Sequence, residues 1–290
     1  MQLRTRGVRD GQTIVLSCNR GEFSIAFALL LSLRSWTVIF AKVRRVVESD
    51  IDFDKVVLTE ATDLVPPEKQ IVIEPEWFAS MGTAPATDYT KVEGVGGNFV
   101  VQSSGTTGIP KFILSSEAAR LHDMFAMAHY TTEEFSNMRF LTSSGVNTSW
   151  AMNTNLPVLL GGGSVVSLGE HSNRLLQYID LHNVTHLATT PALISDTLKL
   201  DNPQQFLRPV REVLIAGAYA PPGLMDRLAE VSSARILLAY GATETGALSQ
   251  AVYSAGSDDQ NSYLGELYRN DVELAFFDDA TEGISCRDDP

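Results

Sequence analysis

The residues with the clearest chemical potential form one polar stretch that directly follows the apolar run 98–102. The stretch reads Ser103, Ser104, Gly105, Thr106, Thr107, Gly108, Ile109, Pro110 and Lys111. Glycine lets a ligand approach backbone N–H groups closely, and a row of such groups beside hydroxyls binds anions. This composition favours a polyphosphate ligand, although the same residues would also suit an ordinary polar turn. The spacing differs from the Walker pattern, in which Gly-Lys-Ser/Thr closes the loop, because here a proline precedes the lysine.

A second candidate stretch follows the apolar run 236–239 and reads Tyr240, Gly241, Ala242, Thr243 and Glu244. Alone, its Thr-Glu pair would usually be a solvated turn. Together, the two stretches resemble the SSGTTGxPK phosphate loop and the YGxTE motif of the adenylate-forming (AMP-binding) enzymes. That family includes acyl-CoA synthetases, firefly luciferase and the adenylation domains of peptide synthetases.

The resemblance implies a role for the residues of both motifs. Residues 103–108 and Lys111 would bind the phosphates of ATP, and Tyr240 would stack on the base beside Gly241 and Ala242. The hydroxyl of Thr243 would meet the α-phosphate. Glu244 would ligate Mg²⁺, since hard oxygen donors suit a cation that bridges substrate phosphates. On the same resemblance, the expected catalytic residues are Thr107, Lys111 and Glu244.

A third segment, residues 216–222, follows a predicted strand and opens a predicted helix. From its residues alone it is either a tight turn that admits a ligand to the backbone or a plain packing turn. It resembles the family's GGAPLPP segment, which lies against the adenine. The resemblance therefore adds Gly217, Ala218 and Tyr219 to the candidate nucleotide-binding residues.

The stretch that starts at residue 146 lies where the family has its acyl-pocket helix, and the resemblance places the acid pocket between residues 147–155 and the turn 217–219. The expected acid-binding residues are Asn147 and Trp150, with Gly217 and Gly241. Amino-acid-activating relatives have an aspartate near Asn147 that pairs with the substrate amine, and many acyl-CoA synthetases have a histidine near position 146. This chain has neither, and a buried ammonium without a partner is unfavourable. We therefore expect an acid without an α-amine, and the resemblance to aryl-acid activators favours an aromatic or hydroxylated one. A tryptophan on an amphipathic helix is otherwise more often a core residue.

Composition excludes several classes of protein. The chain has 290 residues and a formal net charge of -13, which argues against nucleic acid or an anionic membrane as partner. Its longest apolar run, 23–33, is too short to span a bilayer. The two cysteines, Cys18 and Cys286, lie far apart and predict neither a disulfide framework nor a zinc site. We expect a reducing, cytoplasmic location.

Apolar runs alternate with helical stretches and predict an α/β fold with two successive, mostly parallel sheets flanked by helices. Strands are expected at 13–16, 37–40, 55–58, 70–73 and 98–102, and then at 139–142, 164–167, 185–188, 212–215 and 235–239. Helices are expected at 23–33, 173–182, 191–200 and 222–231, and from Ser115 or Ser116 toward Tyr130. An antiparallel strand is expected at 272–277.

We predict a first α/β subdomain at 1–135, which ends in the phosphate loop and the following helix. A second, at 136–250, would hold the acid pocket and the YGATE motif. A partial antiparallel β subdomain would occupy 251–290.

The function that the resemblance implies is an AMP-forming carboxylate ligase core, an ATP-dependent acid–thiol ligase of the acyl-adenylate synthetase type. It would use Mg-ATP to activate an aryl or acyl acid for transfer to a thiol such as coenzyme A. In the family a TGD motif and a small C-terminal lid domain with a catalytic lysine come next, and neither occurs in these 290 residues. We therefore expect slow adenylation by this chain alone, with a separate lid domain or a carrier protein as a candidate partner. The alternative is a non-catalytic nucleotide- or adenylate-binding module.

Overall fold

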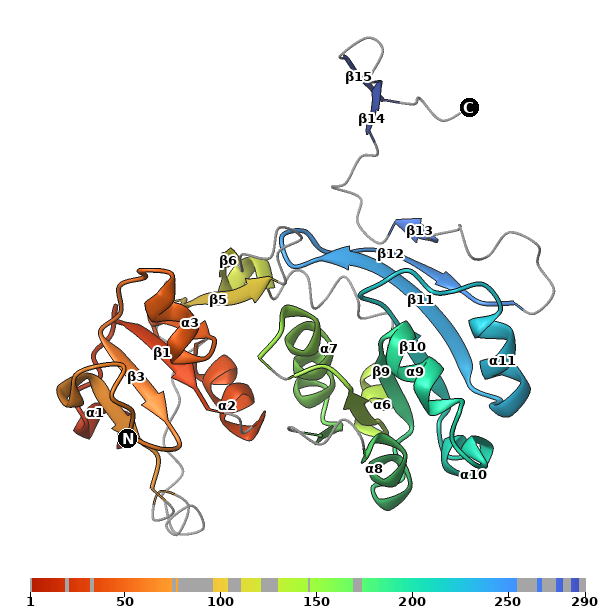
Figure 1. The fold of residues 1–290 in the computed structure, drawn as a ribbon, viewed down its shortest axis with the longest axis horizontal. Coiled ribbons are helices and arrows are strands. Elements are labelled where there is room, and N and C mark those ends of the chain that lie inside the picture. The colour runs from red at the N-terminus through yellow and green to blue at the C-terminus, as the bar shows by residue number, and fades with distance from the viewer. Residues whose placement is uncertain are drawn as a thin grey trace.

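The computed structural model describes residues 2–18, 21–31, 34–74, 77, 96–103, 111–120, 130–145, 147–168, 174–254, 265–267, 275–278 and 283–286. Two β-sheets lie side by side, and helix α7 (Ser149–Leu160) lies between them (Figure 1). A separate antiparallel pair, β14 (Ala275–Asp278) and β15 (Gly283–Cys286), completes the described elements. The predicted fold class is confirmed.

The first sheet has the strand order β4-β3-β1-β2-β5-β6. Its strands are β1 (Thr13–Ser17), β2 (Thr37–Phe40), β3 (Lys55–Leu58), β4 (Gln70–Val72), β5 (Asn98–Ser103) and β6 (Lys111–Ser116). The first five are parallel to their neighbours, and β6 pairs antiparallel with β5. Ile14 and Leu16 belong to one buried cluster, and Val15 belongs to another. Because both faces are covered, these strands are apolar throughout rather than alternating.

Helices cover the two faces of this sheet separately. Phe27 and Ala28 of α2 (Gly21–Leu31) join the cluster of Ile14. Val43 and Val46 of α3 (Val43–Glu48) join the cluster of Val15. Two short elements, α1 (Gln2–Thr5) and the 3-10 helix η1 (Pro67–Lys69), complete this half.

The second sheet has the order β13-β12-β11-β10-β9-β7-β8. Its strands are β7 (Arg139–Thr142), β8 (Ser164–Ser167), β9 (His186–Thr189), β10 (Glu212–Ile215), β11 (Arg235–Ala242), β12 (Gly246–Val252) and β13 (Glu266–Leu267). The pairings from β8 to β11 are parallel, and β12 is antiparallel to both its neighbours.

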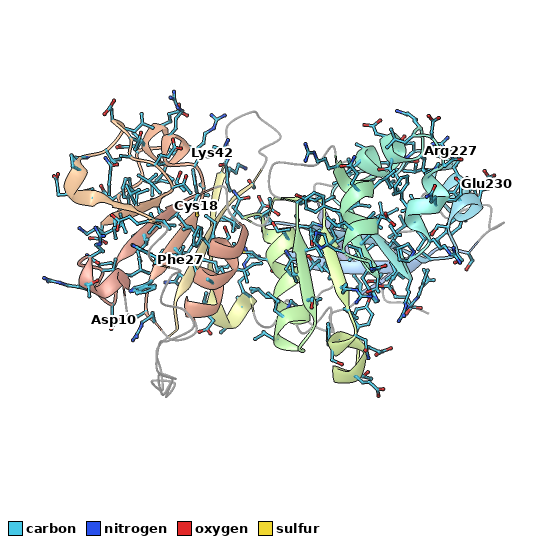
Figure 2. All side chains as sticks on the ribbon, turned by 90° about the horizontal axis from the view of Figure 1, so that it is seen from below. Asp10, Cys18, Phe27, Lys42, Arg227 and Glu230 are labelled. Carbon is cyan, nitrogen blue, oxygen red and sulfur yellow. The ribbon has the colours of Figure 1, made fainter. Side chains whose placement is uncertain are left out.

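One face of the second sheet packs against side chains of α8 (Leu175–Leu181), α9 (Pro191–Thr197), α10 (Pro203–Leu207) and α11 (Leu224–Val231). The other face packs against α6 (Thr132–Ser136) and α7. Figure 2 shows Arg227 and Glu230 of α11 at one end of the molecule, and Phe27 of α2 in the half formed by the first sheet.

Helix α7 joins the two halves of the molecule. Met152 and Leu156 pack with the first sheet, whereas Trp150 and Val158 pack with the second. The helix begins after Thr148, whose hydroxyl accepts a hydrogen bond from the Ala151 N–H at 3.2 Å, as an N-cap residue does. Burial on two sides explains why this segment lacks the apolar stripe of a surface helix.

The predicted strands agree with the structure to within a few residues at their ends, but two antiparallel hairpins were not predicted. Residues 111–116 form β6 rather than a lead into a helix, and β12 folds back along β11. Ser116 nevertheless caps a helical segment at 117–120, because its Oγ accepts from the Ala119 N–H at 3.2 Å. The continuation of that helix toward Tyr130 lies outside the described residues. Across the described part of the chain, no helix is both long and apolar enough to traverse a lipid bilayer.

Candidate functional site

A cleft of about 720 Å³ opens at the carboxyl ends of parallel strands from both sheets. Phe40 ends β2 and Ser103 ends β5, while Thr190 follows β9 and Ala216 follows β10; all four line the cleft. In open α/β sheets, ligands bind outside the carboxyl ends of the strands. The cleft therefore occupies the expected position for a ligand site.

Both ends of the expected phosphate loop lie at this cleft. Ser103 and Lys111 are paired across the β5–β6 ladder, and both line the cleft. Ser103 is buried and Lys111 is exposed. The loop residues between them, Ser104, Gly105, Thr106, Thr107 and Gly108, lie outside the described residues.

The Thr-Glu pair lies at the tip of the β11–β12 hairpin. The Thr245 N–H donates to the Ala242 carbonyl at 3.3 Å, and the Ala242 N–H donates to Thr245 Oγ1 at 3.2 Å. These bonds close a turn with Thr243 and Glu244 at its centre. Both residues line the cleft, and Glu244 is exposed. The turn therefore holds a hydroxyl and a carboxylate at the edge of the cleft.

Gly241 has a structural reason to be glycine. The β11–β12 register shifts between Tyr240 and Gly241, and a Cβ on Gly241 would lie 2.3 Å from the Gly246 carbonyl oxygen. No side chain fits at that separation. Tyr240, which directly precedes the register shift, is half exposed, at 50%, and lines the cleft.

The turn after β10 contributes only in part. Gly217 has a φ of +88°, in the left-handed region that favours glycine, and it lines the cleft with Ala216. Ala218 and Tyr219 are not among the described residues that line it. Tyr219 is 70% exposed.

The expected acid pocket is formed by the start of α7. Asn147 and Trp150 line the cleft, as do Thr148 and Asn153, which lie in the expected stretch 147–155 but were not named as acid-binding residues. Asn153 is 4% exposed. Two buried polar atoms here, Trp150 Nε1 and Asn153 Oδ1, have no hydrogen-bond partner within the described structure.

Charge in the cleft is sparse. Among the described residues that line it, Lys111 is the one cation and Glu244 the one anion. No cluster of three or more histidine, cysteine, aspartate or glutamate side chains occurs in the part of the chain that the structure describes. Mg²⁺ bound with a nucleotide usually takes one or two carboxylates, water and substrate phosphates rather than a full protein cage. A single exposed glutamate fits that kind of metal site.

The carboxyl and imidazole groups with shifted pKa values lie away from the cleft, at the amino ends of the second-sheet strands. Burial raises the pKa of Glu212, whereas a hydrogen bond from the Tyr130 hydroxyl and the charge of Arg235 lower it. Burial and the nearby Arg211 charge lower the pKa of His186. Glu212 and Tyr130 also line a small inner cavity of about 30 Å³. These groups belong to the packing of the sheet rather than to the cleft.

Several lining residues were missed by sequence reasoning, and most of them could have been found. Phe40, Gln102, Ser144 and Thr190 lie at or just beyond the carboxyl end of a predicted parallel strand. The rule that places ligands there would have identified them. Asn153 lies within the stretch 147–155 that was expected to line the acid pocket, but no residue pattern distinguished it there.

Comparisons with known proteins show what this chain is similar to. A family model described as AMP-binding enzyme matches residues 44–285. Pyochelin synthetase PchE from Pseudomonas aeruginosa is 26% identical over 263 residues, which are 84% of this chain and 17% of that protein. The chain therefore spans less than a fifth of this relative.

Solved structures share the fold. The N-terminal subdomain of NpsA from Klebsiella oxytoca, in complex with anthranilyl-AMSN, matches with a TM-score of 0.71 at 15% identity, over 91% of this chain and 70% of that one. The inhibitor-bound N-terminal domain of FACL13 from Mycobacterium tuberculosis matches with a TM-score of 0.70 at 17% identity, over 87% of this chain and 68% of that one.

Proposed function

This chain belongs to the family of AMP-binding enzymes, and from that membership we propose that its cleft binds ATP with a carboxylic acid and joins them into an acyl-adenylate. One observation carries the proposal: three separate segments converge on a single cleft. They are the two ends of the expected phosphate loop, the tip of the β11–β12 hairpin, and the start of α7. The activity is that of an AMP-forming carboxylate ligase.

The nucleotide occupies the side of the cleft formed by the two hairpins. Residues 103–108 and Lys111 bind the phosphates, and Tyr240 stacks on the base near Gly217 and Gly241. Support comes from the position of Tyr240, which is half exposed and lines the cleft. Thr243 donates its hydroxyl to the α-phosphate. Glu244 would hold Mg²⁺, which would supply neutralisation of phosphate charge when bound.

The acid occupies the side formed by α7. Its carboxylate oxygen attacks the α-phosphorus of ATP, the bond to the bridging oxygen of the β-phosphate breaks, and pyrophosphate leaves with that electron pair. Such a reaction needs positioning and charge stabilisation more than covalent help from the protein. No acidic residue is among the described residues of the acid side, which supports an acid without an α-amine.

On the basis of the family, the acyl group of the adenylate would pass to a thiol, such as that of coenzyme A or of a carrier protein. The resulting thioester would be the product of a second step at the same cleft. The full sequence of reactions would make the chain an acid–thiol ligase core.

ATP–pyrophosphate exchange with a panel of carboxylic acids tests this function. We expect exchange with short aryl or acyl acids and little with α-amino acids. Asn147→Asp should shift the preference toward acids that carry an amine, because it adds a carboxylate to pair with the ammonium. A wild-type preference for α-amino acids would contradict our assignment of the acid side. Tight nucleotide binding without exchange for any acid would instead support a non-catalytic module.

A further inference from the structure

We infer that Arg120 is a positioning residue. Through Ser149 it fixes the start of α7 relative to the β5–β6 hairpin, and it thereby sets how the acid lies against the phosphates of ATP. The inference rests on the proposed function, because it concerns the alignment of the two substrates within the proposed cleft. It starts from a buried cation that the proposed function does not use.

The side chain of Arg120 contacts the wall of the cleft from behind. Arg120 is 2% exposed, and its Nη1 donates a hydrogen bond to Ser149 Oγ. Ser149 is the first residue of α7 and lines the cleft, whereas Arg120 is not among the described residues that line it. A guanidinium presents its N–H donors in a rigid, planar arrangement. The contact is therefore directional, and it acts on the acid side through Ser149.

Arg120 and Lys111 belong to one continuous segment of the chain. Lys111 opens β6, and the helical segment 117–120, which ends at Arg120, follows β6 directly. Ser116 caps the start of that helical segment, because its Oγ accepts from the Ala119 N–H at 3.2 Å. The same segment therefore carries the cation proposed to bind the phosphates and the side chain that holds the start of the proposed acid side.

Apolar packing alone does not fix where α7 lies along the hairpin. Met152 and Leu156 lie on the same helical face as Ser149, and both belong to one buried cluster with apolar side chains of β5. Hydrophobic contacts are non-directional, so they tolerate a small displacement of the helix. The hydrogen bond from Arg120 does not tolerate it, because such a bond weakens steeply away from its preferred geometry.

Helix electrostatics do not account for a cation at this place. The helix dipole favours cations at the C-terminal end of a helix and disfavours them at the first turn. Arg120 nevertheless contacts the first residue of α7. Places where a local rule is broken are often functional sites. Alignment is a function that this contact can serve, because a displacement of about 1 Å between reacting groups can cost roughly a hundredfold in rate.

Binding of ligands that span both sides of the cleft tests the inference without requiring turnover. The spanning probes are the sulfamoyl adenosines of benzoate and hexanoate, and AMP is the reference that occupies the nucleotide side only. Each is titrated by calorimetry into the full chain. We expect the wild type to bind the better acyl analogue more tightly than AMP. Arg120→Met and Ser149→Ala should each lower that affinity ratio roughly tenfold and leave AMP affinity within about twofold.

The two substitutions should not be additive, because each breaks the same contact. The double variant Arg120→Met with Ser149→Ala should therefore lose no more of the affinity ratio than either single variant. Arg120→Lys keeps the charge and a donor on a different side chain, so it should retain part of the ratio. Ser149→Ala and Arg120→Lys carry the test if Arg120→Met does not fold. Fully additive losses would overturn the inference.

Thr142→Val is the matched control for a general loosening of α7. It removes the hydroxyl that donates to Asn155 Oδ1 at 2.7 Å, and neither residue is among the described residues that line the cleft. This variant should lower the melting temperature and leave the affinity ratio unchanged. If it lowers the ratio as much as Arg120→Met does, at an equal loss of melting temperature, the effect is not specific to Arg120 and the inference is wrong.

The outcomes also separate the inference from the proposed function. An unchanged affinity ratio in Arg120→Met and Ser149→Ala would overturn the inference alone, because the acyl analogues would still bind across the cleft. If neither acyl analogue binds the wild-type chain more tightly than AMP, the acid side is wrongly assigned. The proposed function and the inference would then fail together.

Discussion

Lys111 and Glu244 provide the charge of the cleft among its described residues, and they come from hairpins in different sheets. Lys111 opens β6, and Glu244 lies in the turn between β11 and β12. A lysine ammonium is a point charge on a flexible side chain, whereas an arginine guanidinium presents its N–H donors in a rigid, planar arrangement. It is therefore suited to follow phosphate charge as pyrophosphate departs.

Replacing Lys111 with glutamine should slow adenylation more than it weakens ATP binding, because the charge is most useful where negative charge develops. We expect kcat for ATP–pyrophosphate exchange to fall on the order of tenfold to hundredfold. Loss of a preorganised donor typically costs roughly 10²–10³, and solvent screens an exposed cation. Arg227→Gln is the control, since Arg227 is exposed on α11 at the far end of the molecule (Figure 2). If the Lys111 variant exchanges pyrophosphate at the wild-type rate, Lys111 has no role in the proposed chemistry.

A single residue could be predicted to belong to the candidate site only where a local sequence pattern identified it. The motif around Tyr240 and Glu244 could be recognised in the sequence, and the structure adds a steric reason for Gly241. Asn153 lies in the stretch 147–155 that was expected to line the acid pocket, but an asparagine within a helix has no distinctive spacing that would single it out. The burial of Asn153 and the absence of a hydrogen-bond partner for its amide oxygen within the described structure are visible only in the structure.

At the scale of elements, the strands were predictable from the residues, whereas α7 was expected from the family resemblance alone. Parallel strands covered on both faces are continuous apolar runs, which bounded β2, β3 and β7 correctly. Helix α7 contains Asn153, Thr154, Asn155 and Pro157 among its apolar residues, so neither period nor propensity delimits it. The hairpins depend on long-range pairing, which a local apolar run does not encode.

The β10–β11 pair offers a test of pH dependence at the same scale. Glu212 and Arg235 are opposite each other in the parallel register, and their side chains are 3.5 Å apart. Burial raises the pKa of Glu212, so the fold favours its protonated form. The stability that protonated Glu212 contributes is fully present below the pKa that its carboxyl has in the unfolded chain. It is lost as pH rises through the higher pKa of the carboxyl in the folded protein.

Glu212→Gln places a neutral side chain at this position at every pH, whereas the wild-type carboxyl becomes charged as pH rises. The free energy of unfolding of the variant, relative to the wild type, should therefore increase from about pH 4 toward neutrality. Urea unfolding of both proteins across that range measures the difference. Glu230→Gln, an exposed change on α11, controls for the loss of one carboxylate. A relative stability of the Glu212 variant that falls with rising pH would mean that pairing with Arg235, and not burial, dominates.

At the scale of the whole molecule, the cleft exists because two sheets and α7 meet. Phe40 and Ser103 come from the first sheet, Thr190 and Gly217 from the second, and Trp150 from the helix between them. The sequence predicted both sheets but not how they are joined. That arrangement depends on a helix buried against both, through Met152 on one side and Val158 on the other (Figure 1).

Whether this cleft binds a magnesium nucleotide is measured most directly by calorimetric titration of ATP with and without Mg²⁺. The wild-type chain should bind ATP more tightly with Mg²⁺, and Glu244→Gln should lose most of that gain, on the order of tenfold to hundredfold for one charge-assisted contact. Glu230→Gln should match the wild type, because Glu230 lies on α11 at the far end of the molecule (Figure 2). Unchanged Mg²⁺-dependent ATP affinity in Glu244→Gln, or no ATP binding by the wild-type chain, would contradict the proposed site.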